Sequence, residues 1–304
     1  MQSLTDPLNP RLGLATLGVV VASALFGIVP VFARSLTDAG MAAHAVAFYR
    51  YVLAVAVLMP VVWHWRHLPR TLAWGAFVGV VMGLGWVGYV RAIEVVPVST
   101  AGVLYMTYPA FALVFSWALF GDRPSGRGII ASLMIVAAAA LVSRPGAVPP
   151  EHVPALILSL AAPAGFGLGI SVLVHRLIDI PVLARIGVVS AGSVIGLAPL
   201  MLATPLEAIV PASANGWLMV VGIGLGTALI PQLIYTFCSP LIGTARTAMA
   251  GSIELPVMFA VGWFFFNESL YAAQGIALIL VIAAIGITPA KRARSIAAPL
   301  KPGD

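Results

Sequence analysis

The chain is divided into long apolar runs, and this feature restricts its fold more than any other. A bilayer core about 30 Å thick is crossed by roughly 20 apolar residues in a helix, because each residue rises about 1.5 Å. Such runs are continuously apolar and do not alternate in polarity as barrel strands do. We therefore predict an all-α integral membrane protein with ten transmembrane helices. The ten runs lie at 12–33, 43–63, 71–93, 98–120, 126–143, 153–174, 182–203, 215–237, 246–266 and 271–289.

The composition agrees with a membrane protein and argues against nucleic-acid binding. Hydrophobic residues make up 61% of the chain and charged residues 9%, whereas about a quarter of the residues of a soluble domain are charged. The net charge of +6 comes from basic residues scattered between apolar runs, which build no basic patch. The single cysteine, Cys238, excludes an intramolecular disulfide or a CxxC metal cluster. We expect the lipid bilayer as a partner, no nucleic acid, no metal and no other cofactor.

The basic residues collect on one side of the predicted membrane. With the N-terminus placed inside, the outer loops hold three of them: Arg34, Arg91 and Arg144. The inner loops and tails hold twelve: Arg11, Arg66, Arg70, Arg123, Arg127, Arg176, Arg185, Arg246, Lys291, Arg292, Arg294 and Lys301. Cytoplasmic loops of membrane proteins carry an excess of Lys and Arg, so this bias predicts that both termini are cytoplasmic.

Two distant stretches share one arrangement. They are YPAFALVFSWALFGDRPSGRG at 108–128 and LPVMFAVGWFFFNESLYAAQG at 255–275, with three identities in 21 aligned positions. In each, a proline precedes an apolar aromatic run, a carboxylate (Asp122 or Glu268) and a glycine 19 residues after the proline. We predict a first five-helix repeat at 1–145, a second at 150–290, and a basic cytoplasmic tail at 291–304.

An odd number of helices per repeat makes the second copy enter the membrane from the opposite face. The repeats are therefore inverted, with Asp122 inside and Glu268 outside, each in a loop that terminates a helix. Inverted repeats and broken helices are typical of secondary transporters, in which the substrate lies near the midplane. Prolines within the spans fit broken helices, although prolines are also generally commoner in membrane helices. These prolines are Pro30, Pro109, Pro163, Pro199, Pro231 and Pro256.

Several segments together resemble one known family. They are SALFGIVPVFAR (23–34), AFYRYVLA (47–54), STAGVLYMTYPAFALVF (99–115), GDRPSGRGIIASLMIVAAAALV (121–142) and ELPVMFAVGWFFFNESLYAAQGIALILVIAAIGI (254–287). Over about residues 12–290 the chain resembles the drug/metabolite transporter superfamily, in its ten-helix EamA-type branch. It is most similar to YddG-like exporters of aromatic and neutral amino acids. The two halves differ at one position, because Gly187 of the second half aligns with Arg50 of the first. The halves therefore cannot contribute identical chemistry to a shared site.

Two ionisable residues lie well inside predicted spans, where charge is expensive and usually faces a bundle interior or a cavity. Arg50 lies in 43–63, and Glu254 stands two residues before Pro256. In a functional interpretation, Arg50 binds a substrate carboxylate, and Glu254 binds a substrate ammonium or titrates during coupling. In a structural interpretation, Arg50 binds backbone carbonyls and Glu254 caps groups freed by the proline. The residues themselves leave both open.

Paired side chains three residues apart form a second set of candidates. Residues three apart share one helix face, and flat apolar walls with a few polar groups suit an amphiphilic organic substrate. The alternative is that these tyrosines lie at the lipid interface. The pairs are Trp86 with Tyr89, Tyr105 with Tyr108, and Gln232 with Tyr235. A glycine series, Gly75, Gly79 and Gly83, indicates close helix packing instead.

Other function classes fit less well. The chain has no GxxxxGK[ST] motif, which argues against transport driven by its own ATP hydrolysis. All five histidines lie at loops or helix ends, and Glu254 has no intramembrane carboxylate partner, so an enzyme is disfavoured. A pore would show charged rings or a carbonyl filter built by an oligomer. We predict a secondary transporter that exports small organic solutes, most of all amino acids including aromatic ones, across the bacterial inner membrane. Exporters of other metabolites or drugs, and a channel, are the alternatives, and the single chain is a candidate functional unit.

Overall fold

The computed structural model describes residues 10–143 and 148–287, and these residues form helices and no β-strand. The predicted tail at 291–304 lies outside the described residues. The first half forms α1 (Pro10–Gly27), α2 (Val29–Asp38), α3 (Ala43–His64), α4 (Pro69–Val95), α5 (Val98–Tyr105), α6 (Tyr108–Phe120) and α7 (Gly126–Val142). The second half forms η1 (Pro150–His152), α8 (Val153–Ser159), α9 (Ala161–His175), α10 (Val182–Leu202), η2 (Leu206–Ala208), α11 (Ala214–Val221), η3 (Gly222–Leu229), α12 (Ile230–Gly251), α13 (Glu254–Phe266) and α14 (Ala272–Ile287). The expected all-helical fold is thus confirmed.

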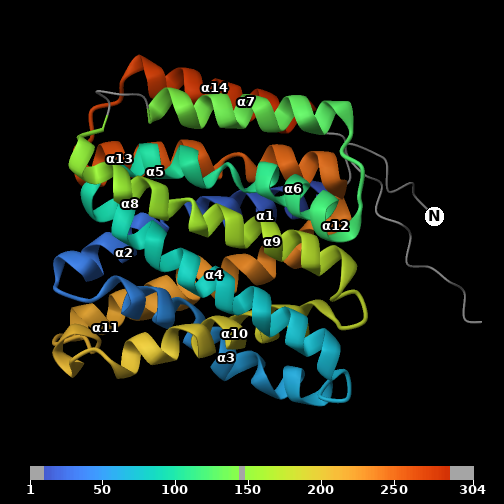
Figure 1. The fold of residues 1–304 in the computed structure, drawn as a ribbon, viewed down its shortest axis with the longest axis vertical. Helices are drawn as coiled ribbons and strands as arrows, with labels where there is room; N and C mark the ends of the chain where they lie inside the picture. Colours follow the sequence, from blue (N-terminus) through green and yellow to red (C-terminus); the bar gives the residue numbers. More distant parts are fainter. Residues whose placement is uncertain (1–9, 144–147, 288–304) are drawn as a thin grey trace, which may run out of the picture.

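Seven stretches of the described chain are long and apolar enough to cross a membrane: Arg11–Asp38, Ala43–His64, Pro69–Val95, Val98–Phe120, Pro150–His175, Val182–Leu202 and Ala214–Ile242. Shorter apolar helices occupy Gly126–Val142, Glu254–Phe266 and Ala272–Ile287. These helices run roughly side by side, across the longest axis of the molecule (Figure 1). The chain is therefore a multi-pass membrane protein.

The apolar helices are interrupted at four positions next to prolines. The interruptions fall at Ile28, at Met106–Thr107, at Leu160 and at Ser252–Ile253. In each case a proline stands within the first three residues of the next helix, because proline has no N–H to continue the preceding helical ladder. These prolines are Pro30, Pro109, Pro163 and Pro256. The predicted broken helices are thus present at these four positions, while Pro199 lies inside the continuous helix α10.

Helix α12 differs from the sequence-based boundaries. We expected a break at 238–245, but helical backbone continues through it. Thr247 Oγ1 nevertheless donates to the carbonyl oxygen of Ser239 at 3.3 Å, whereas eight residues of straight helix would separate these groups by about 12 Å. The chain therefore bends sharply within α12. Pro240 lies in this bend and has no N–H to support a straight helix.

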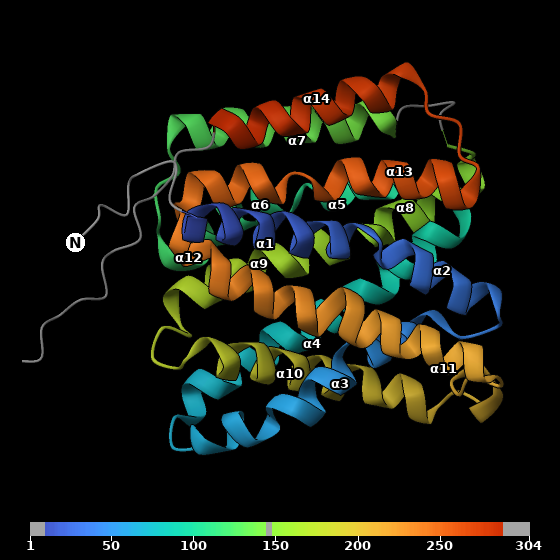
Figure 2. The same ribbon diagram turned by 180° about the vertical axis from the view of Figure 1, so that it is seen from behind.

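Helices from the two halves interleave throughout the bundle. Helices α7 and α14 lie side by side along one edge, and α3 packs against α10 toward the other (Figures 1 and 2). Between them, α1 packs against α12 and α4 packs against α9. No half of the described chain forms a separate bundle, so the core belongs to both.

The glycine series on α4 allows one of these close contacts. A Cβ added to Gly75 would meet the side chain of Val188, and one added to Gly83 would lie 3.0 Å from Ser193. Between them, Gly79 faces the backbone of Gly192, and the carbonyl oxygen of Gly79 accepts a hydrogen bond from Ser193 Oγ at 2.8 Å. The predicted role of these glycines in close helix packing is confirmed, and their partner is α10.

The two similar stretches end their first helices in the same way. The residue that follows each helix, Gly121 after α6 and Asn267 after α13, is in the left-handed conformation, with φ of 71° and 50°. The next amide donates six residues back in each case, from Asp122 N to Ser116 O at 3.2 Å and from Glu268 N to Gly262 O at 2.9 Å. This is the hydrogen bond of a Schellman motif. Asp122 and Glu268 therefore follow helix ends, as expected.

Candidate functional site

An aromatic cluster occupies the core near the helix breaks. Trp86 and Tyr89 come from α4. Tyr105 is the last residue of α5 and Tyr108 is the first residue of α6, so these two tyrosines flank the helix break at Met106–Thr107. Ring centroids lie 5.0 Å apart for Trp86 and Tyr89, and 5.7 Å apart for Tyr89 and Tyr105. Tyr105 and Tyr108 are separated by 5.9 Å. The structure therefore brings these four predicted residues together.

The second half of the chain adds a ring that the sequence analysis missed. Phe166 of α9 lies 4.9 Å from Tyr108 and 6.1 Å from Tyr105 between ring centroids. The sequence could have identified Phe166, because it lies three residues after Pro163, and Tyr105 and Tyr108 also lie within about one turn of a proline that breaks a span. The cluster thus spans both halves of the chain.

Arg50 lies against this cluster from α3. Its Cζ is 4.1 Å from the centroid of the Trp86 ring, a distance typical of a cation–π contact. The side chain is buried, and its Nη1 makes no hydrogen bond with a described residue. The ring face does not use the N–H donors, which lie in the guanidinium plane. Arg50 is therefore a buried cation with a donor still available.

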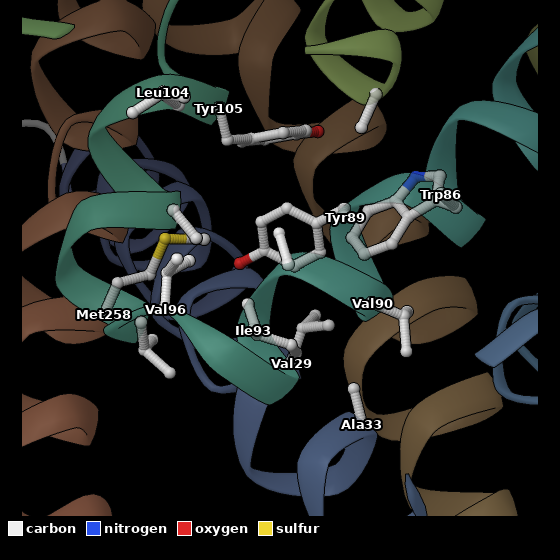
Figure 3. Packing of buried hydrophobic residues seen from close by; sticks show 14 of the residues in the cluster. Val29, Ala33, Trp86, Tyr89, Val90, Ile93, Val96, Leu104, Tyr105 and Met258 are labelled. Carbon is white, nitrogen blue, oxygen red and sulfur yellow. The ribbon is translucent and has the colours of Figure 1, made fainter. Parts of the chain in front are cut away.

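Two tyrosine hydroxyls near Arg50 are buried in the same way. Tyr89 is 1% exposed, and its hydroxyl has no hydrogen-bond partner in the described part of the chain. Figure 3 shows its ring beside Trp86 and below Tyr105, with the hydroxyl directed away from Trp86. The hydroxyl of Tyr51, which the sequence analysis did not select, lies near Arg50 and Ser193 without forming a hydrogen bond. Leaving a buried polar group unpaired costs about 1–3 kcal/mol, so these hydroxyls are suited to a polar ligand or water.

Glu254 provides the opposite charge from the other half. It is the first residue of α13 and is half-buried, and an anion is stabilised at a helix N-terminus. Its charge and that of Arg50 act on each other, and both act on Tyr89 and Tyr105. The carboxylate of Glu254 and the guanidinium of Arg50 therefore lie around one aromatic cluster.

The predicted pair on α12 lies at the edge of this region. Tyr235 packs beside Phe26 of α1, with 6.3 Å between ring centroids, and interacts electrostatically with Glu254. Gln232 is half-buried on the same helix, and among the described residues it forms no hydrogen bond with the aromatic cluster. Tyr235 thus joins the candidate site, whereas no hydrogen bond among the described residues connects Gln232 to it.

The breaks of different spans meet beside these residues. Gly27, at the end of α1, approaches Glu254, and an added Cβ would lie 2.8 Å from the Glu254 carbonyl oxygen. Gly167 of α9 approaches the α5–α6 break, where an added Cβ would lie 2.8 Å from the Tyr108 carbonyl oxygen. Irregular backbone at membrane depth is tolerated where it is buried in protein or lines a cavity. No three His, Cys, Asp or Glu side chains within 10–143 and 148–287 come together as potential metal ligands.

Glu268 connects the two halves at one end of the bundle. Its carboxylate accepts hydrogen bonds from Val98 N at 2.6 Å, from Ser99 N at 3.2 Å and from Ser99 Oγ at 3.1 Å. Gln274 Nε2 also donates to Ser99 Oγ, at 3.2 Å. The first amides of a helix have no partner within the helix, so Glu268 caps α5 from a loop about 170 residues away. Nearby, the Arg34 Cζ lies 4.7 Å from the Phe266 ring.

Comparisons with known proteins agree with this architecture. Residues 13–144 match the model of the EamA-like transporter family. A solved structure described only as "Crystal structure of protein" aligns with a TM-score of 0.60 at 20% sequence identity, over 90% of this chain and 96% of that chain; a similarity this distant shows the fold alone. No curated protein matches the chain. Residues 13–144 are thus similar to the EamA-like transporter family, while this match does not extend to the rest of the chain.

Proposed function

We propose that the protein is a secondary transporter that exports amino acids, including aromatic ones, across the bacterial inner membrane. One observation carries the proposal. Arg50 from the first half and Glu254 from the second are opposite charges around a shared aromatic cluster. An α-amino acid presents a carboxylate, an ammonium and a side chain on neighbouring atoms, which matches such a set.

In this proposal each group has a separate task. The free Nη1 of Arg50 donates to the substrate carboxylate, and Glu254 accepts from the ammonium. The rings of Trp86, Tyr105 and Tyr108 form apolar walls, because aromatic pairs favour offset or edge contacts with a further ring. Without substrate, Glu254 is free to take up a proton, which provides a route to proton coupling.

We also propose that the chain consists of ten spans in two inverted five-helix repeats, with both termini cytoplasmic. The interrupted stretches support this arrangement, because they are the first and the fourth of the five proposed spans in each half. They are 10–38 and 98–120 in the first half, and 150–175 and 246–266 in the second. The identical ends of α6 and α13 give further support. Corresponding broken helices in two halves are a feature of transporters built from inverted repeats.

The packing supports the same arrangement. Exchanging the halves maps the contact of the α1–α2 stretch with α12 onto that of the α8–α9 stretch with α4. It maps the pairs α3–α10 and α7–α14 onto themselves. It also relates the contact of Gly27 with the α12–α13 break to that of Gly167 with the α5–α6 break. Relative motion of the two break pairs would expose the aromatic cluster to one side of the membrane at a time.

Counterflow in proteoliposomes tests the function. Vesicles loaded with one unlabelled amino acid are expected to accumulate a labelled aromatic or neutral amino acid, while empty protein-free vesicles do not. Glu254→Gln is expected to lose the pH dependence of exchange, with Glu207→Gln, on an exposed residue of η2, as the matched control. The substrate class is wrong if no member of a broad amino-acid panel exchanges. Accumulation of other metabolites instead would favour a different exporter of the superfamily, and unsaturable flux would favour a pore.

A further inference from the structure

A small polar cavity lies where the beginning of α4 meets the turn between α9 and α10. Its volume is about 190 Å³, and its lining includes Arg70, Thr71, Trp74, His175, Arg176 and Asp179. Sites for drug-sized ligands occupy about 300–1,000 Å³, so this cavity suits a compact polar group. It contains residues of both halves and lies at the opposite end of the bundle from Glu268.

The cavity is cationic. Neither Arg70 nor Arg176 forms an ion pair with a residue of the described chain. Arg176 is held in place by two rings, because its Cζ lies 5.6 Å from the centroids of Trp74 and Phe120. The nearby Asp179 carboxylate interacts with Arg185. Two guanidinium groups and one carboxylate, that of Asp179, therefore line the cavity, so its lining carries an excess of positive charge.

Arg185 also fixes the turn that carries Arg176 and Asp179. Its Nε donates to Ile180 O at 2.8 Å and its Nη2 donates to Ile178 O at 3.1 Å. His175 in turn stacks on Phe120 at 4.2 Å and pairs with Asp122 at 3.2 Å. These contacts of Arg185 and His175 use neither Arg70 nor Arg176.

Exposed apolar side chains lie next to residues that line the cavity. The Trp74 ring contacts Phe77 edge to face, with 6.1 Å between centroids. Phe77 is 51% exposed on α4, and Val174 is 57% exposed on α9. Exposed apolar side chains of a spanning helix contact acyl chains. A molecule with an anionic headgroup and long acyl chains would satisfy both the arginines and these apolar side chains.

We propose that this cavity binds the headgroup phosphate of an anionic phospholipid, whose acyl chains lie along Phe77 and Val174. Planar guanidinium groups bind phosphate oxygens in bidentate fashion, and basic pockets between transmembrane helices bind anionic headgroups. The lipid would connect α4 of the first half to the α9–α10 turn of the second. It would thereby stabilise the contact between these two segments.

Lipid retention by the purified full-length protein tests the proposal. Native mass spectrometry after incubation with equal amounts of phosphatidylglycerol and phosphatidylcholine is expected to show preferential retention of phosphatidylglycerol. Arg70→Gln and Arg176→Gln are each expected to lower that retention about five-fold, the effect of one arginine near an anionic lipid. Arg123→Gln is the matched control, because Arg123 is exposed on the α6–α7 loop at the same end and does not line the cavity.

Three outcomes would overturn the lipid site. Equal retention of both lipids by the wild-type protein would remove the preference for anions. An equal loss in Arg123→Gln would indicate general surface attraction. Phosphatidylglycerol is expected to raise the thermal unfolding midpoint, and inorganic phosphate at the same concentration is not. An equal rise with inorganic phosphate would show that the cavity binds free phosphate instead of a lipid. If Arg176→Gln unfolds, Arg176→Lys provides the comparison, since it keeps the charge and is expected to retain an intermediate amount of lipid.

Discussion

At the scale of single residues, the guanidinium of Arg50 packs on an aromatic ring but leaves one hydrogen-bond donor unpaired within the described structure. Its 4.1 Å contact with the Trp86 ring stabilises the charge, with a magnitude of about 2 kcal/mol when such a pair is desolvated. The contact leaves Nη1 without a hydrogen bond in the described structure. A buried charge normally requires hydrogen-bonded partners, so the arrangement favours a bound carboxylate over a purely structural role.

Replacing Arg50 by lysine separates charge from geometry. Arg50→Lys keeps the cation but loses the planar fork, and losing a charged hydrogen bond costs about 1.5–3 kcal/mol. We expect the KM for exchanged amino acids to rise roughly ten- to a hundred-fold, as measured by counterflow, while the protein stays folded by thermal unfolding. Arg91→Lys, with its side chain 54% exposed, serves as the control. An unchanged KM for Arg50→Lys would favour the structural interpretation.

Tyr89 allows a test in which stability and activity change in opposite directions. Its buried hydroxyl is unpaired, so Tyr89→Phe removes a group that costs about 1–3 kcal/mol. We expect an equal or higher thermal unfolding midpoint together with slower amino-acid exchange. Tyr271→Phe, at a residue that is 69% exposed, should change neither. A variant with wild-type exchange would exclude the Tyr89 hydroxyl from substrate binding.

At the scale of elements, the helix breaks depend on close backbone approach. Gly27→Ala would place a Cβ 2.8 Å from both the Glu254 carbonyl oxygen and the Val257 side chain, and such overpacking costs about 1–3 kcal/mol. We expect a lower thermal unfolding midpoint in detergent. Gly13→Ala is a matched control on the same helix, because its Cβ meets nothing within 4 Å. If both variants unfold at the same temperature, the contact between α1 and the α12–α13 break is not as close as described.

The cap that Glu268 places on α5 has a measurable effect of its own. Its three hydrogen bonds include both of the first amides after Pro97, and loss of a helix cap costs about 0.5–2 kcal/mol. Glu268→Ala is therefore expected to lower the thermal unfolding midpoint, and Glu268→Gln, which keeps an acceptor oxygen, to lower it less. Glu207→Ala removes an exposed carboxylate and should have no effect. A midpoint for Glu268→Ala equal to that of the wild type would contradict the capping role.

At the scale of the whole molecule, local patterns predicted some features and missed others for identifiable reasons. Continuous apolarity predicted the helices, and the missing N–H of proline predicted where four of them break. Helical spacing brought Trp86 next to Tyr89, since those residues share one face of α4. The contacts of Phe166 with the tyrosines and of Glu268 with α5 depend on packing between the two halves. A sequence pattern within one helix cannot predict such contacts. The segment 238–245 was expected as a gap between two spans, but the helical backbone of α12 continues through it and bends.

The proposed inverted arrangement makes a prediction about which side of the membrane each loop faces. Gly126 begins α7 beside Asp122, and an added Cβ there meets nothing within 4 Å; Tyr271 is 69% exposed beside Glu268, at the other end. Single cysteines at these positions in a Cys238→Ala background are expected to react with an impermeant maleimide from opposite sides. Intact cells should label only Tyr271→Cys, and inside-out vesicles only Gly126→Cys, because positively charged loops stay cytoplasmic. Labelling of both positions from one side would rule out two inverted repeats, since the similar stretches must then enter the membrane from the same face.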